Sequence, residues 1–408
     1  MENNRNILSR HRPANKKTAF WTAGLLAMAV ALPVSALDVR IPQLELSTVG
    51  ASTEDSFALS SSAIARIAFT GGPKFGGTIE LGASADQLED YLREGTPLPL
   101  SMGLLSFTAY RLGNLPLDIS WFLGAGDAFC NGDSFSTWFE DAPAGSDYRG
   151  IQYFPNGING DSTLQYDGIH RTSGTGLRVA LNHSRSTLTA FYLYQDMDLA
   201  RAENDGDGEI GTIDDLIMNS GFWSGDIRFL YNSNNVKFEA FTGVSFPMAG
   251  AGTWRGGLLA FISTGTGADF LLQAGIPRWN SNVAIDIDNF FFLFEPRIAM
   301  GPTSLHITLF YHPYWYRQQV TGDQAATDLN LRFTIGGIQR SLMEGGLETT
   351  ILFRGQSGGE GPIGISINPF FSFLHSGVRW DLKAMVDPFM FSDITKVLSA
   401  YVGVRTAF

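Results

Sequence analysis

The stretch 398-LSAYVGVRTAF-408 ends the chain and decides how the rest of the sequence is interpreted. Successive side chains of a β-strand point to opposite faces. Leu398, Val402 and Phe408 would therefore share one face, with Tyr401 and Arg405 on the other. A strand that is apolar on one side and mixed on the other suits the wall of a barrel with lipid outside it.

This ending resembles the closing strand of Gram-negative outer-membrane β-barrel proteins, in which the terminal aromatic residue belongs to the signal read by the barrel assembly machinery. The resemblance is to a class of proteins. It implies a location in the bacterial cell outer membrane, with outer-membrane lipid and the assembly machinery as partners. A soluble sheet can also end on an aromatic residue, so the rest of the chain must repeat the pattern.

The amino end is typical of an export signal. Several arginines and lysines precede an apolar run from Ala19 to Val34, and Val34-Ser35-Ala36 offers small residues for cleavage. We therefore expect residues 1–36 to be a signal peptide and 37–408 to be the mature domain. An uncleaved membrane anchor is the alternative.

Charge and cysteine content exclude some classes of protein. The net charge of −12 argues against nucleic acid as a partner, because binding it requires a basic surface. The single Cys130 cannot form an internal disulfide.

After residue 36 no segment approaches the roughly 20 apolar residues of a membrane helix. A mature protein in a membrane must then be a closed barrel, since an open sheet edge would leave unpaired amides in lipid.

Alternating segments recur along the whole mature chain. Asp328 to Gly336 is the clearest, with Leu329, Leu331 and Phe333 on one face. The fold class predicted is all-β, a transmembrane antiparallel up-and-down barrel of about 16–18 strands, within a range of 14–18. The eighteen candidate strands are 39–50, 60–70, 74–84, 99–111, 115–126, 175–184, 186–196, 222–231, 236–246, 253–263, 268–277, 290–300, 304–312, 328–336, 346–354, 363–374, 377–386 and 398–408.

The links between these segments alternate between short and long, as expected of outer-membrane barrels. Soluble sandwiches and propellers need no such consistent short and long side. The longest link, 127–174, is rich in Gly, Asp, Ser and aromatic residues. So long a connection in a compact domain indicates a functional loop. In porin-like proteins such a loop often folds back into the lumen.

Charged residues fall repeatedly opposite the apolar face. A basic residue facing lipid at the membrane midplane would cost about 2–4 kcal/mol, so these residues should face inward. A barrel of this size leaves a water channel unless a loop or plug fills it. The charges either stiffen a wet wall in pairs or set a transverse field that orients polar solutes. The predicted pore-lining residues are Arg178, Asp226, Arg228, Arg255, Glu295, Arg297, Arg332, Glu348, Arg354, Arg379, Asp381 and Arg405.

One acidic segment resembles the calcium loop of EF-hand proteins, with oxygen ligands at alternate positions and a glycine at the turn. The residues that would bind the metal are Glu203, Asp205, Asp207, Glu209 and Asp214. The match departs from the motif, because Glu203 replaces the first aspartate and Asp214 the final bidentate glutamate. A solvated acidic surface loop is the alternative, and no other cofactor is expected.

The sequence shows no nucleophile motif, zinc spacing or phosphate loop, so we do not expect an enzyme. The favoured function is a porin-like channel for passive diffusion of small polar solutes or ions, and its oligomeric state stays open, a homotrimer included. The alternatives are a surface-exposed structural or adhesive barrel with a calcium-binding loop, or an uptake channel for hydrophobic compounds. The first of these alternatives would be favoured if the loop 127–174 projected outward.

Overall fold

The computed structural model describes residues 37–52, 57–85, 93, 100–146, 168–197, 222–247, 252–312, 326–337, 342–353, 363–388 and 398–406. The expected signal peptide and the expected calcium loop with Glu203, Asp205, Asp207, Glu209 and Asp214 lie outside the described residues. Among the helices that are described, none is long and apolar enough to span a membrane.

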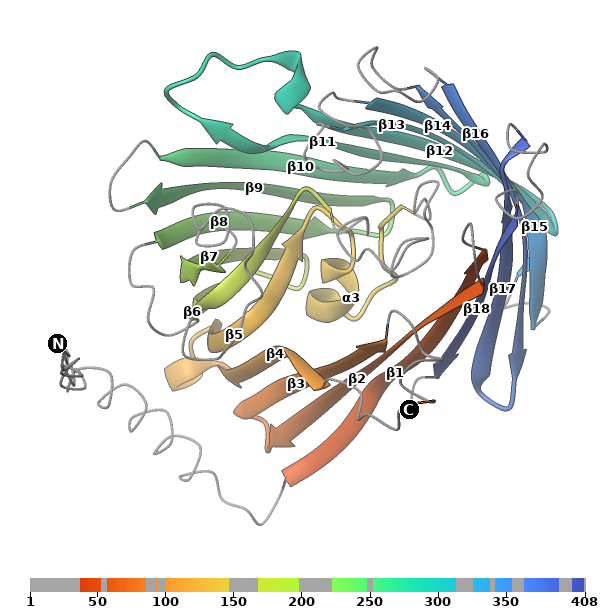
Figure 1. Ribbon diagram of the computed structural model, residues 1–408. Coiled ribbons are helices and arrows are strands. Elements are labelled where there is room, and N and C mark those ends of the chain that lie inside the picture. Colours follow the sequence, from red (N-terminus) through yellow and green to blue (C-terminus); the bar gives the residue numbers. More distant parts are fainter. Residues whose placement is uncertain are drawn as a thin grey trace, which may run out of the picture.

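Eighteen strands form one sheet in which neighbours in sequence pair antiparallel (Figure 1). β1 also pairs with β18, from Leu44↔Thr406 to Ala51↔Ser399, so the sheet closes into a barrel. This confirms the predicted fold class. The strands are β1 (Leu37–Ser52), β2 (Phe57–Gly71), β3 (Phe75–Ala85), β4 (Leu100–Ala109), β5 (Leu117–Phe129), β6 (His170–Asn182), β7 (Thr187–Asp196), β8 (Phe222–Asn232), β9 (Val236–Pro247), β10 (Thr253–Ser263), β11 (Ala268–Asn280), β12 (Phe291–Met300), β13 (Thr303–His312), β14 (Ala326–Gly337), β15 (Met343–Phe353), β16 (Ile363–His375), β17 (Val378–Val386) and β18 (Leu398–Thr406).

The boundaries of most strands differ from those predicted by a few residues, and those of β5, β6 and β15 bear on the site. β5 and β6 continue beyond the expected ends of the loop 127–174, and Ala128↔Arg171 and Phe129↔His170 pair there. The link between them is therefore 130–169. The Gly-rich and Asp-rich composition of these strand ends hid the pairing. β15 starts at Met343 rather than at Gly346, because Met343, Glu344 and Gly345 continue its ladder with β14.

The links divide the barrel into two ends. At one end, which we call the short-link end, the connections are 72–74, 110–116, 183–186, 233–235, 264–267, 301–302, 338–342 and 376–377. The connections at the other end, the long-link end, are 53–56, 86–99, 130–169, 197–221, 248–252, 281–290, 313–325, 354–362 and 387–397. The alternation predicted from the sequence is present, with 53–56 and 248–252 as the shortest members of the long side.

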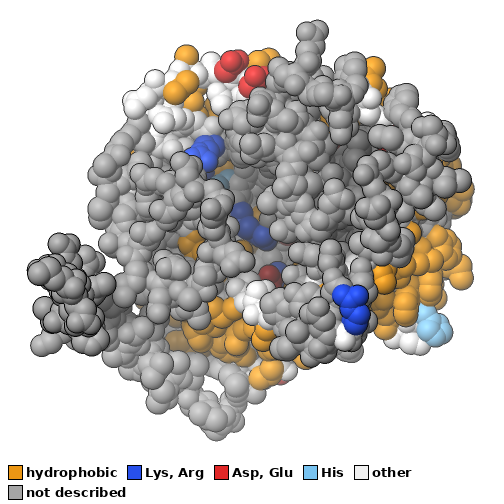
Figure 2. All heavy atoms as spheres, in the orientation of Figure 1, with side chains coloured by type: hydrophobic (Ala, Val, Ile, Leu, Met, Phe, Trp, Pro, Cys, Tyr) orange, Lys and Arg blue, Asp and Glu red, His pale blue; other side chains and the backbone are white. Residues whose placement is uncertain are grey.

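The two faces of the wall differ in chemistry, and β8 shows this most clearly. The side chains that point outward on β8 are exposed and apolar, and they are Trp223, Ile227, Phe229 and Tyr231. The alternate side chains are buried and mostly polar, and they are Ser224, Asp226, Arg228 and Leu230. Figure 2 shows hydrophobic side chains over much of the visible outer wall. On β8 the period-two pattern therefore gives an apolar outer face and a mostly polar inner face.

β5 leaves the wall before it ends. Its ladder with β4 runs from Ala109↔Ile119 to Leu104↔Gly124, and β5 then goes on pairing with β6 as far as Phe129. Gly124 has a φ of 104°, and a Cβ atom there would lie 2.2 Å from the carbonyl oxygen of Gly103. A glycine is required at this position, where the chain turns toward the lumen.

Candidate functional site in the barrel lumen

The described part of the link between β5 and β6, residues 130–146, lies inside the barrel, and we call it the lumen loop. Its helix α3 (Ser134–Phe139) stands within the ring of strands in Figure 1. The Oγ of Ser136 donates to the carbonyl of Asp133 over 2.7 Å at the start of the helix. Glu140 ends the helix in the left-handed conformation, with a φ of 55°. The described part of the loop thus folds inward and does not project from the barrel.

A buried ion pair on the wall holds the start of the lumen loop. Arg228 of β8 and Glu239 of β9 lie 2.8 Å apart, and both side chains are 0% exposed. Glu239 accepts a hydrogen bond of 2.6 Å from the backbone N–H of Cys130. Arg228 donates to the carbonyl of Ala128 and to the Oγ of Ser134. Each charge of the pair therefore also satisfies a polar group of the loop, as a buried charge requires.

A second set of contacts holds the far end of the loop. Lys237 of β9 lies 3.0 Å from the carboxylate of Asp141 and also donates to the carbonyl of Ala142. Arg297 of β12 donates to the carbonyl of Gly145 over 2.5 Å. Next to it, Ser146 donates to Glu295. The loop is thus fastened to the wall at both ends of its described length.

Apolar side chains fill the space between the loop and the wall. The loop side contributes Phe129, Cys130, Phe135, Ala144 and Ile169, all 0–3% exposed. On the wall they meet an apolar patch, and together they form one core whose wall residues include Leu188, Leu230, Phe241, Leu259, Leu271, Phe291, Leu293 and Phe310. Burial of each large side chain contributes roughly 1.5–3 kcal/mol. The inner wall along β7 to β13 is therefore packed against the loop.

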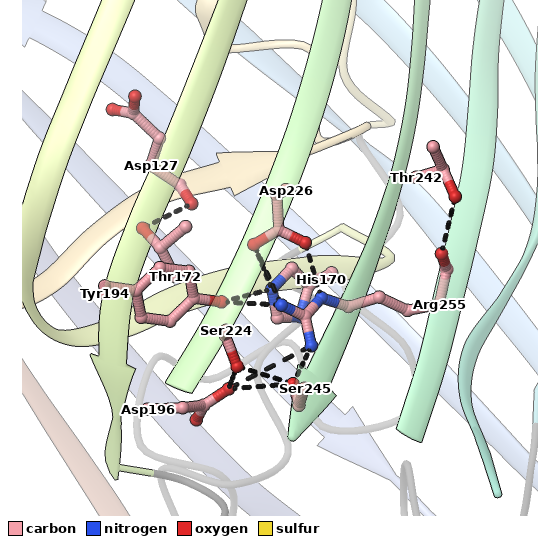
Figure 3. Close-up of polar contacts among 10 residues, drawn as sticks. All are labelled: Asp127, His170, Thr172, Tyr194, Asp196, Ser224, Asp226, Thr242, Ser245 and Arg255. Carbon is pink, nitrogen blue, oxygen red and sulfur yellow. Dashed lines mark hydrogen bonds and ion pairs between the residues drawn. The ribbon is translucent and has the colours of Figure 1, made fainter. Parts of the chain in front are cut away.

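A polar network lies beside this core (Figure 3). Arg255 binds both carboxylate oxygens of Asp226, at 2.7 and 2.9 Å, and donates to the hydroxyl of Tyr194 at 3.0 Å. His170 Nε2 lies 3.1 Å from the same hydroxyl. Ser224, Ser245 and Asp196 continue the network. Since its charges are paired within the wall, the network ties β6 to β10 together beneath the loop.

The surroundings of two titratable groups of the lumen loop, Cys130 and Asp141, shift their pKa values. Burial, together with the nearby Glu239 carboxylate, raises the pKa of the Cys130 thiol well above its usual value. The hydrogen bond from Lys237, assisted by the backbone N–H of Ala142, lowers the pKa of Asp141. The thiol is therefore held neutral, while the Asp141 carboxylate stays charged and bound to the wall.

On the part of the wall opposite the packed half, charged side chains of β17 and β2 are more exposed. The Arg379 side chain of β17 is 34% exposed, and Arg66 of β2 is 44% exposed beside Glu80 at 2.6 Å. Figure 2 shows Lys and Arg side chains deep in a hollow of the molecule. Arg379 and Arg66 thus keep part of their side chains accessible on this side of the lumen.

The predicted pore-lining residues fall into three groups. Those buried on the inner wall are Asp226, Arg228, Arg255, Glu295, Glu348 and Asp381. Those partly exposed on it are Arg178, Arg297, Arg332 and Arg379. Arg354 lies outside the described residues, and only the backbone of Arg405 is described, opposite Arg379 and Glu45. That these residues line a path for solutes stays a prediction.

The sequence-based prediction passed over several residues of this site. Lys237 and Glu239 alternate with Phe238 along β9, so they carried the same signal as the charges that were selected. Gln273 donates 2.5 Å to the carbonyl of Cys130, but an uncharged side chain gave no signal. Glu344 lay before the predicted start of its strand. Among the described residues no group of three or more His, Cys, Asp or Glu side chains is placed to hold a metal ion.

The backbone is similar to solved bacterial porins. Two of them are mutants of the Rhodopseudomonas blastica porin, one 9% identical with a TM-score of 0.43 and one 10% identical with a TM-score of 0.41. Each match covers 91% of this chain and 100% of the porin. No protein-family model matches the sequence, and no curated protein matches it. Similarity at this level carries no argument about function, and the closed barrel rests on its own strand pairing.

Proposed function

We propose that this protein is a porin-like channel in the outer membrane of a bacterial cell, through which small polar solutes or ions diffuse passively. It acts without catalysis. Outer-membrane lipid surrounds it, and the barrel assembly machinery inserts it. The single observation that supports this proposal best is the contrast between the two faces of a closed wall, apolar and exposed outside and charged inside.

The physical argument begins with the cost of placing a sheet in lipid. A closed barrel leaves no unpaired strand edge, and its apolar outer side chains need no water. A barrel of this size is also too wide for its own wall side chains to fill the lumen. The lumen loop fills the half along β7–β13, which leaves a narrower path between the loop and the inner wall of β14–β18 and β1–β3.

The position of the lumen loop favours the channel over a surface-binding barrel. An adhesive function for this segment would require it to project outward, and its described part lies inside, fastened by Arg228, Glu239 and Lys237. Calcium binding by Glu203, Asp205, Asp207, Glu209 and Asp214 stays a separate proposal. It can be tested by calcium titration of the purified protein.

Reconstitution into planar lipid bilayers tests the channel directly. Purified mature protein should produce discrete conductance steps in potassium chloride. Its folding is established separately by its β-sheet circular dichroism and by a change in electrophoretic mobility on heating. A folded preparation that produces no steps would contradict the proposal.

A further inference from the structure

The link between β11 and β12, residues 281–290, exposes large apolar side chains at the long-link end of the barrel. We call it the apolar loop. Val283, Ile285 and Ile287 are 62%, 50% and 68% exposed, and Phe290, just before β12, is 41% exposed. Single exposed apolar residues are ordinary, but a group of them marks a surface that meets an apolar partner.

Hydrogen bonds within the apolar loop fix its shape. The N–H of Val283 donates to the carbonyl of Asn280 over 3.0 Å. The short helix η4 (Ile287–Asn289) begins with a reciprocal cap. In this cap Asp286 accepts from the N–H of Ile287 over 2.6 Å, and Asn289 accepts from the N–H of Asp286 over 3.0 Å. The exposed apolar side chains therefore belong to a folded segment.

An aromatic side chain of β11 fastens the apolar loop from the outer face of the wall. Nε1 of Trp279 donates to the carbonyl of Val283 over 2.9 Å. Trp279 stands directly opposite Trp254 of β10. Trp254 is 46% exposed and precedes the buried, inward-facing Arg255, so it lies on the outer face. Residues directly opposite on neighbouring strands share a face, which places Trp279 on the outer face as well.

A second outer-face side chain, Tyr311 of β13, fastens the other end of the apolar loop. Its hydroxyl lies 3.3 Å from the carbonyl oxygen of Ile287 and 3.2 Å from the carboxylate of Asp288. Tyr311 follows the buried Phe310 and stands opposite the exposed Phe292, so it points outward. In Figure 1 the loop stands outside the ring of strands, at the top of the view. The apolar loop is thus held against the outside of the wall.

The apolar loop adjoins an apolar part of the outer wall. The exposed aromatic side chains nearest to it in the sheet include Trp254 of β10 and, on β12, Phe292 and Phe294, which are 36% and 37% exposed. Tryptophan side chains of membrane proteins are enriched at the boundary between lipid and water. The loop therefore extends the apolar outer surface beyond the ends of β11 and β12.

We propose that the apolar loop lies at the head-group boundary of the outer lipid leaflet, with Val283, Ile285 and Ile287 against the acyl chains. The proposal rests on the proposed outer-membrane location, in which the long-link end faces the cell exterior. Lipid is favoured over a second copy of this chain because the loop continues the apolar wall. The hydrogen-bonded acids Asp286 and Asp288 favour the boundary over the membrane interior, where charge is costly.

Quenching of a fluorescent label by lipids tests this position. Single cysteines replacing Ile285 or Ile287 in a Cys130→Ala background are labelled with a nitrobenzoxadiazole fluorophore, and the folded protein is inserted into phosphatidylcholine vesicles. The vesicles contain lipids with a nitroxide near the head group or near the end of the acyl chain. Both labels should lose fluorescence, and more of it with the nitroxide near the head group.

The control label replaces Thr266, an exposed residue of the short link 264–267. It should lose less fluorescence than the labels at 285 and 287. Labels at 285 and 287 that are quenched no more than the label at 266 would overturn the proposal.

A double variant tests whether the apolar side chains hold the loop in lipid. A label at position 283 should lose most of its quenching in I285N/I287N. The matched control is L112N/L115N, which removes two leucines that are 47% and 60% exposed in the link 110–116, and it should leave the quenching at 283 unchanged. Unchanged quenching in I285N/I287N, or an equal loss in L112N/L115N, would contradict the proposed contact.

Two further measurements separate the other outcomes. Spin labels at 285 should show no defined distance between copies in vesicles, and a defined distance would mean that a second copy covers the loop. A label replacing Phe229, on the outer face of β8, reports on the membrane location by itself. Quenching at 229 without quenching at 285 and 287 would overturn the position of the loop and leave the membrane location standing. If the label at 229 is not quenched either, the membrane location fails and the inference fails with it.

Discussion

Arg228 and Glu239 face each other across β8 and β9 at 2.8 Å, fully buried, and each also bonds to the segment at the start of the lumen loop. The pair therefore connects the wall to the loop as well as one strand to the next. Neither charge can reach water, so removing one partner leaves the other buried and unpaired. We therefore expect the loss of either charge to lower the stability of the whole barrel.

Replacing Arg228 with Met should lower the free energy of unfolding by about 3–5 kcal/mol, since Glu239 is left buried without its partner. Denaturant titration of the protein in detergent or lipid measures this. Arg40→Met is the matched control, because Arg40 and Asp38 lie at the same distance of 2.8 Å with side chains 74% and 52% exposed. The control should change stability by about 1 kcal/mol or less. Equal effects of the two substitutions would contradict the anchoring role.

Cys130 should resist alkylation in the folded protein. Its thiol is fully buried, and burial raises its pKa, so little reactive thiolate forms. Mass spectrometry after iodoacetamide treatment should show slow labelling of the folded protein and rapid labelling after denaturation. Glu239→Gln weakens the bond to the Cys130 N–H and should speed labelling of the folded state. Equal rates before and after denaturation would mean that the loop does not cover this residue.

Enlarging the exposed face of α3 should narrow the path. Thr137 is an exposed residue of this helix, so Thr137→Trp should lower single-channel conductance. Leu193→Trp adds a similar volume at a 57% exposed position on the outer face of β7 and should leave conductance unchanged. If Thr137→Trp conducts as the wild type does, solutes do not pass beside α3.

A charged residue on the outer face should lower the free energy of unfolding only if that face contacts lipid. Phe229 of β8 is exposed and points away from the lumen. Phe229→Lys should lower the free energy of unfolding in lipid by about 2–4 kcal/mol if the residue lies near the midplane, with Phe229→Leu as the apolar control. A lysine that is neutral or stabilising here would mean that water surrounds the barrel.

Much of the wall could be predicted from the sequence, because period-two alternation is local and each strand carries it independently. All eighteen predicted segments are strands, and Asp328 to Gly336 falls within β14. The same alternation identified the inward charges Arg332 and Arg379. These predictions needed only the pleat of a strand.

The lumen could not be predicted to the same degree, because its contacts join distant parts of the chain. Ser146 meets Glu295, and Cys130 meets Gln273, through pairings that no local pattern records. The alternation placed Arg228 on the inner face, but it gave no sign that the loop would bury this side chain. Which inward charges the loop covers depends on how the chain packs in three dimensions.

The accessibility of spin labels along β14 in lipid vesicles tests directly whether the exterior of the barrel faces lipid. Labels are attached to single cysteines at 331, 332, 333, 334 and 335 in a Cys130→Ala background. A lipid-facing exterior predicts a period of two, with oxygen from the bilayer reaching positions 331, 333 and 335 and a water-soluble nickel complex favouring 332 and 334. Equal access of the nickel complex to all five positions, or the opposite alternation, would contradict a lipid-facing exterior around a wet lumen.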